Sequence, residues 1–173
     1  MNDRTLPPKA PAVDKLLGPL VSHGVDFVVV GGMAGLAHGS NYPSFDLDVA
    51  YARDAGNLER LVAALKEIGV TLRGGPLGLP FQLDVQTLQN GANFTFMTSH
   101  GDFDVLADVG GVGSYEQLRA GSEVKEIAGV HVRVASIDHL ISMKRASNRT
   151  KDQLMLEEYI VIADEQQRTD AAG

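Results

Sequence analysis

Two aspartates in the stretch SFDLDVAY stand two residues apart in a run that has the composition of a strand. Side chains at positions i and i+2 of a strand point to the same face, so Asp46 and Asp48 are predicted to lie side by side. Neighbouring carboxylates repel each other unless a cation binds between them or they reach water. Mg²⁺ prefers oxygen ligands of this kind. The pair therefore predicts either a divalent-metal site or a solvent-facing strand with no catalytic role.

A glycine pair, Gly31-Gly32, lies between the apolar run DFVVV and the aspartate strand. The run predicts a buried strand over 26–30, and a short helix is expected over 33–37. Glycines after a strand let the backbone approach a phosphate closely, and the N–H groups that begin a helix face an anion. A phosphate site beside a metal site indicates metal-bound NTP and phosphoryl or nucleotidyl transfer.

A third carboxylate is needed to hold two metal ions and to activate an attacking hydroxyl. Asp104 in FDVLADV is the preferred candidate, because it lies between apolar residues on a predicted strand. Its rivals are Asp84, Asp102 and Asp108. Asp102 is expected in a turn, and Asp108 lies towards the far end of the same strand.

The densest group of cations in this acidic chain comprises Lys144, Arg145, Arg149 and Lys151. Cations that face a triphosphate stabilise the charge that spreads over its oxygens during transfer. The alternative interpretation is a solvated helix face whose cations compensate the helix dipole.

The elements that must position these residues are mixed in type. Helices are predicted over 13–23, 57–68, 136–145 and 151–163, and a further helix is predicted to begin near residue 114. Asn57 is the predicted cap of the helix over 57–68. Strands are predicted over 45–51, 81–85, 93–98 and 103–109, with two more around 128–129. This order predicts an α/β (α+β) fold in which helices pack on a mixed, mostly antiparallel sheet.

The domain organisation is predicted to be simple. A flexible lead-in over 1–12 precedes a single domain over 13–165, and a frayed tail covers 166–173. Residues 71–80, rich in glycine and proline, are expected to form a mobile loop.

The 173-residue chain carries a formal net charge of −7 and contains no cysteine. The acidity argues against a broad nucleic-acid surface, although a local basic cluster could still contact one RNA end. The lack of cysteine excludes disulfides and thiolate metal sites. The first residues lack the apolar core of a signal peptide, and no run of about 18 apolar residues exists. We therefore expect a cytoplasmic protein with no membrane segment.

Three stretches together resemble the nucleotidyltransferase superfamily, which has the polymerase-β-like fold. The first is VVVGGMAGLAHGSNYPSFDLDVAY, which matches the family's glycine turn and its Asp-x-Asp strand. GDFDVLADVGGVGSY resembles the third-acid strand, and SIDHLISMKRASNRTKDQLML resembles the closing helical motif. The similarity is greatest to small bacterial stand-alone members related to abortive-infection and toxin–antitoxin nucleotidyltransferases.

The resemblance implies a role for each matching residue. Mg²⁺ or Mn²⁺ would be bound by Asp46, Asp48 and Asp104, and Asp104 would also accept the proton of the acceptor hydroxyl. NTP, the substrate, would contact Gly31, Gly32, Ser44, Lys144, Lys151 and Asp152. The catalytic set implied is Asp46, Asp48, Asp104 and Lys144.

The resemblance also implies an activity, namely Mg-dependent transfer of a nucleoside monophosphate from an NTP to a hydroxyl. The acceptor would be an RNA 3′ end, a protein or a small molecule, and a cognate antitoxin is a candidate partner. The alternative is a catalytically inactive binding or regulatory module of the same fold. Gly32 and Tyr42 leave room for it, since many relatives have serine and arginine at these positions.

Overall fold

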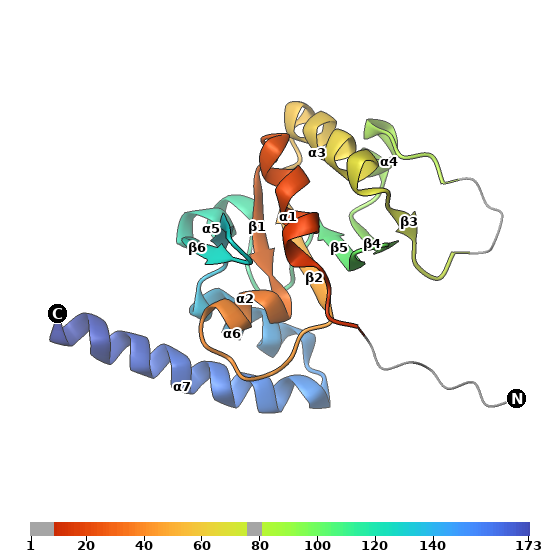
Figure 1. The fold of residues 1–173 in the computed structure, drawn as a ribbon. Coiled ribbons are helices and arrows are strands. Elements are labelled where there is room, and N and C mark those ends of the chain that lie inside the picture. Colours follow the sequence, from red (N-terminus) through yellow and green to blue (C-terminus); the bar gives the residue numbers. More distant parts are fainter. Residues whose placement is uncertain (1–8, 76–80) are drawn as a thin grey trace, which may run out of the picture.

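The computed structural model describes residues 9–75 and 81–173. Within these ranges one seven-stranded sheet has the order β3-β4-β5-β2-β1-β7-β6 (Figure 1). The strands are β1 (Phe27–Val30), β2 (Asp46–Tyr51), β3 (Thr71–Leu72), β4 (Asn93–Thr98), β5 (Gly101–Leu106), β6 (Glu123–Ile127) and β7 (Val130–Val134). Only the β1–β7 and β2–β5 pairs are parallel among these strands. The predicted mixed, mostly antiparallel sheet is confirmed.

Helices cover the sheet and extend beyond it. They are α1 (Val13–Ser22), α2 (Gly31–Ala37), α3 (Ala55–Ile68), α4 (Val85–Asn90), α5 (Tyr115–Gly121), α6 (Ile137–Ser147) and α7 (Thr150–Ala172). Figure 1 shows α1 in front of the central strands, whereas α2, α6 and the long α7 lie together at one end of them. None of the helices in the described ranges is long and apolar enough to cross a bilayer.

The strand that carries the paired aspartates has one buried and one polar face. Leu47 and Val49 are fully buried in the core, and Asp46 and Asp48 alternate with them. This alternation is the period of two that the sequence shows. Beside β2, the four residues of β1 are all buried, as expected for a central strand with both faces covered. The core therefore fixes which way both aspartates point.

His38 ties three elements together behind the glycine turn. Its Nε2 lies 2.8 Å from the carbonyl oxygen of Ala135, just after β7. Its Nδ1 lies 3.0 Å from Nε2 of Gln166 in α7. Since a carbonyl only accepts, the Nε2–H donates and Nδ1 accepts from the amide. The end of α2 is thus fixed against both the sheet and the C-terminal helix.

Two local predictions are wrong. No strand covers residues 81–85; instead α4 begins at Val85, because the Asp84 carboxylate accepts a hydrogen bond from the Thr87 N–H at 2.7 Å. The predicted cap Asn57 lies inside α3, which Asp54 caps. Asn57 is buried and bonds the backbone groups of Asp26.

The last helix is longer than predicted. It continues from Thr150 to Ala172, through the residues expected to form a tail. The expectations for the lead-in and the 71–80 loop fall partly on residues 1–8 and 76–80, which lie outside the described residues. Within the loop, residues 71–72 form the short strand β3, which pairs with β4.

Candidate active site

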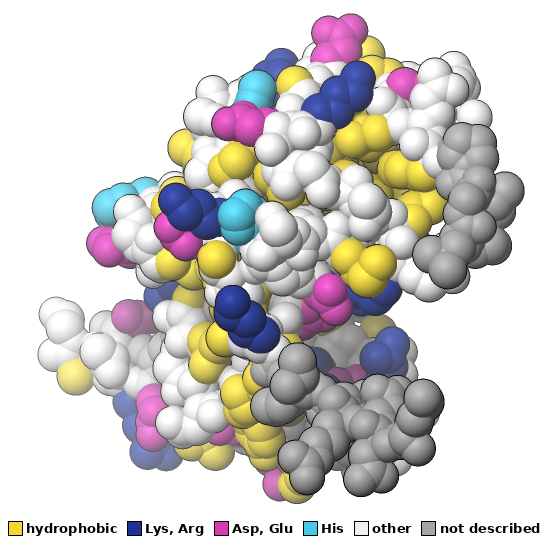
Figure 2. Space-filling model, turned by 45° about the vertical axis from the view of Figure 1, so that its right-hand side comes forward, with side chains coloured by type: hydrophobic (Ala, Val, Ile, Leu, Met, Phe, Trp, Pro, Cys, Tyr) yellow, Lys and Arg dark blue, Asp and Glu magenta, His cyan; other side chains and the backbone are white. Residues whose placement is uncertain are grey.

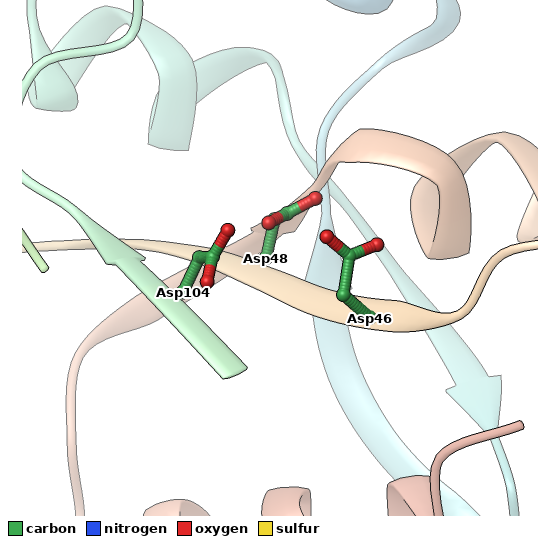
Figure 3. Close-up of side chains that lie close together, drawn as sticks. All are labelled: Asp46, Asp48 and Asp104. Atoms are coloured by element: carbon green, nitrogen blue, oxygen red, sulfur yellow. The ribbon is translucent and has the colours of Figure 1, made fainter. Parts of the chain in front are cut away.

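Three predicted acids meet on one face of two adjacent strands. Asp46 and Asp48 come from β2, and Asp104 comes from β5 at the position directly paired with Asp48. Each offers a carboxylate oxygen, and these atoms lie within 4.8 Å of one another. Figure 3 shows the three side chains on the same side of the sheet, with Asp48 between the other two. The parallel register of β2 and β5 is what brings the third acid to the pair.

The arrangement is electrostatically costly without a cation. Burial, and then the charges of Asp46 and Asp104, raise the pKa of Asp48 to about 8. Burial also raises the pKa of Asp104, and the nearby charge of Arg73 opposes that shift. Three half-buried carboxylates gathered within 4.8 Å form an oxygen donor set that fits a hard divalent cation.

Gly31 is required where β1 turns into α2. Its φ is +68°, and a Cβ at this position would overlap the carboxylate of Asp48. Any other residue would strain the backbone and displace a metal-ligand candidate. A Cβ on Gly32 would lie 2.8 Å from the Ser44 Oγ, which itself donates to the Asp46 carbonyl oxygen at 3.0 Å. The glycine turn and the aspartate strand are therefore in direct contact.

The junction of α6 and α7 supplies a cation held by a buried acid. Lys144 Nζ lies 2.9 Å from Asp152 Oδ1. The Ser147 hydroxyl donates to the other carboxylate oxygen of Asp152. Burial alone would raise the pKa of Asp152, but the hydrogen bonds from Ser147 and Lys144 lower it. The ion pair therefore fixes the position of the Lys144 ammonium group.

Two hollows adjoin at these residues. Their shared lining comprises Gly31, Asp48, Lys144, Arg149 and Asp152. The first, of about 370 Å³, adds a largely apolar wall formed by Val30, Leu106, Val109, Leu140 and Met143. The second, of about 500 Å³, adds Gly32, Ser44, Asp46 and Lys151, so it combines the glycine turn, acids and cations. One hollow thus suits an organic group and the other suits a polyphosphate with its metal.

Of the three rival acids, Asp84 and Asp108 lie away from the cluster, and Asp102 lies beside it. Asp84 is the cap of α4. Asp108 is exposed beyond the end of β5, although it lines the first hollow. Asp102 was expected in a turn, but it lies within β5, directly paired with Asp46. The strand begins earlier, because residues 99–100 form the turn and Gly101, with φ +121°, already pairs with Thr98.

Arg73 contacts two of the acids, although the sequence did not indicate it. Its Nη2 lies 2.7 Å from Asp104 Oδ1, and its Nε lies 3.4 Å from Asp102 Oδ2. This region shows no periodic pattern, because β3 has only two residues and the pair Gly74-Gly75 follows Arg73. Pairing of β3 with β4 is what carries this arginine to the acids.

The arrangement of this sheet and its helices is found in known proteins. No protein-family model matches the sequence, and no curated protein matches it. Solved structures do match. LnuA, a lincosamide antibiotic adenylyltransferase with lincomycin bound, gives a TM-score of 0.60 at 12% identity, covering 89% of this chain and 99% of that one. ANT(2″)-Ia in complex with adenylyl-2″-tobramycin gives 0.53 at 15% identity, covering 89% and 87%.

A third match is a Thermotoga maritima protein assigned to the nucleotidyltransferases. Its TM-score is 0.52 at 12% identity, covering 86% of this chain and 89% of that one. At such identities the likeness concerns the fold. The chain is a nucleotidyltransferase-fold protein, as the three motifs predicted.

Proposed function

We propose that this protein is a nucleotidyltransferase that uses Mg²⁺ or Mn²⁺ to transfer a nucleoside monophosphate from an NTP to a hydroxyl group. The observation that carries the proposal is the direct contact between the glycine turn and the acids. The backbone of Gly31 lies against the carboxylate of Asp48, and Lys144 faces the same space. A phosphate on the turn would therefore lie beside a metal held by the acids.

Different residues would bind the metal ion and the triphosphate. Asp46, Asp48 and Asp104 would hold the cation, which would supply charge neutralisation at the phosphates and activate the attacking oxygen. Gly31 and Gly32 leave the backbone open to the triphosphate. Lys144 and Lys151 line the same hollow, and their ammonium groups would offset phosphate charge.

The proposed transfer step uses these residues as follows. The acceptor hydroxyl oxygen attacks the α-phosphorus and forms a new P–O bond. The bond from that phosphorus to the bridging oxygen of the β-phosphate breaks, and pyrophosphate leaves. Asp104 takes the hydroxyl proton, for which a carboxylate with a raised pKa is suited. Lys144 stabilises the departing pyrophosphate.

For the acceptor, the first hollow favours a small organic molecule. Its volume of about 370 Å³ and its apolar wall suit a compact ligand that presents a hydroxyl at Asp48, beside Asp104. The face drawn in Figure 2 has acidic and basic side chains interspersed, unlike the basic surface that binds long nucleic acids. An RNA 3′ end, a protein acceptor, a cognate antitoxin and a cytoplasmic location stay predictions from the sequence.

The proposal is tested by following label from NTP. Each α-labelled NTP is incubated with Mg²⁺ and either lincomycin, tobramycin, a small-molecule extract, RNA or protein. Label on an acceptor, with release of pyrophosphate, supports transfer. Asp48→Asn should abolish it, whereas Asp164→Asn, on the exposed face of α7, should not.

A distinct result would point to the alternative function. NTP binding with Mg²⁺ but no transfer to any acceptor class, and no loss of binding in Asp48→Asn, would contradict the catalytic role of the acids. The chain would then be a binding or regulatory module that keeps the fold.

A further inference from the structure

The carboxylates at the site number four rather than three. Asp46 is paired with Asp102, and Asp48 is paired with Asp104, across the parallel strands β2 and β5. Positions of equal parity on a strand share a face, so all four belong to one patch. Four acids at this spacing repel one another strongly when no cation is bound.

One arginine is placed against this patch. The guanidinium of Arg73 contacts Asp104 at 2.7 Å and lies 3.4 Å from Asp102. Among residues 9–75 and 81–173, no other Lys or Arg forms an ion pair with any of the four acids. The nearby ammonium of Lys144 is paired with Asp152 instead.

Arg73 is fixed to the sheet and does not extend freely into solvent. Its backbone N–H donates to the Thr95 carbonyl at 2.9 Å. Its Nη2 donates to the Phe96 carbonyl at 3.0 Å as well as to Asp104. Its side chain is 31% exposed. Arg73 is thus held by backbone carbonyl groups on one side and lies against two acids on the other.

We propose that Arg73 is a built-in counter-cation of this acidic patch. Its charge keeps the four acids together before metal binds, and it competes with a divalent cation for Asp104. The nucleotide-free protein should therefore bind metal more weakly than its acids alone would allow. Because triphosphate brings both a metal ion and further ligands, nucleotide and metal would load the site together. The metal part of this inference rests on the proposed function.

The first experiment measures Mn²⁺ binding to the nucleotide-free protein by electron paramagnetic resonance. Arg73→Gln removes the charge and should bind Mn²⁺ about tenfold more tightly, as expected for one charge lost a few ångströms from the ion. Arg73→Lys keeps the charge and should bind as the wild type does. Arg119→Gln is the matched control, since Arg119 pairs with Asp26 at 3.1 Å away from the site, and it should have no effect.

The second experiment requires no metal. In EDTA, Arg73→Gln should unfold at a lower temperature than Arg73→Lys, because the acids lose their only paired cation within the described chain. Salt screens repulsion between exposed and half-exposed charges, so the difference should shrink as ionic strength rises. Comparison with the lysine variant separates charge from the loss of hydrogen bonds to the sheet.

The results decide the matter in both directions. Unchanged or weaker Mn²⁺ binding in Arg73→Gln would overturn the proposed competition between Arg73 and the divalent cation. A difference in unfolding temperature between Arg73→Gln and Arg73→Lys that does not change with ionic strength would overturn the counter-cation role. If the wild type binds no Mn²⁺, but the difference in unfolding temperature between Arg73→Gln and Arg73→Lys still shrinks with salt, the metal-dependent function is contradicted. The role of Arg73 as a counter-cation of the acids is then still supported.

Discussion

Raising the pH is expected to destabilise the metal-free protein through Asp48. Burial, together with Asp46 and Asp104, raises the pKa of this carboxyl from 3.8 to about 8. Between those values the folded chain holds a proton that the unfolded chain has lost. The stabilisation is thus complete at low pH and is lost as the pH rises towards 8.

The size of the effect follows from the linkage between proton binding and unfolding. One such group changes the free energy of unfolding by at most about 1.4 kcal/mol per pH unit. Solvent reaches the half-buried acids and screens them, so about 2 kcal/mol is expected between pH 5 and pH 8. For a chain of 173 residues this corresponds to a fall of about 4–8 °C in Tm.

The assay is thermal unfolding by circular dichroism in EDTA, at several pH values across this interval. Asp48→Asn, which cannot ionise, should remove most of the slope, whereas Asp164→Asn should keep it. Saturating Mg²⁺ should also flatten the wild-type curve, because a bound cation stabilises the ionised carboxylates. Parallel curves for the wild type and Asp48→Asn would refute the assignment of the slope to this residue.

Three further substitutions test contacts of the site by urea unfolding. Gly31→Ala should lower the free energy of unfolding by about 1–3 kcal/mol, since it combines a positive φ with a clash against Asp48. Gly56→Ala, at a position with no positive φ, should not lower it. Equal losses in the two variants would contradict this account. Asp152→Asn should lower the free energy of unfolding by about 1–3 kcal/mol and reduce transferase activity, because the Lys144 ammonium group loses its charged partner. An unchanged free energy of unfolding would show that the ion pair does not stabilise the fold. Tyr159→Phe removes a buried hydroxyl that has no hydrogen-bond partner among residues 9–75 and 81–173. The free energy of unfolding should therefore stay equal or rise by up to about 1 kcal/mol, and a clear loss would contradict this account.

The placement of the paired aspartates and of the glycine turn was predictable because it depends on local rules. A period of two fixes the common face of Asp46 and Asp48, and a glycine pair after an apolar strand marks a backbone that turns sharply. Both features can be identified within about twenty residues of sequence. Their mutual contact also follows from the short connection between β1 and β2, which pair directly.

The remainder of the site depends on strand pairing over long separations. Asp104 was chosen for its apolar neighbours, but only the β2–β5 register shows that it is opposite Asp48. Asp102 was misplaced because a hairpin boundary cannot be located to one residue from composition. Arg73 was not predicted as a site residue, because a two-residue edge strand shows no periodic pattern. The position of Arg73 depends on the pairing of β3 with β4.

The geometry of Gly31 also argues for a coupling between phosphate binding and metal binding. The missing side chain at this position leaves room for the carboxylate of Asp48, while the same backbone forms the start of α2. A phosphate that approaches the turn must therefore approach Asp48, where its negative charge would add to that of the acids. Such a contact is favourable only with a cation between them. Phosphate and metal should accordingly strengthen each other's binding, and Arg73 makes that dependence stronger by weakening the site for metal alone.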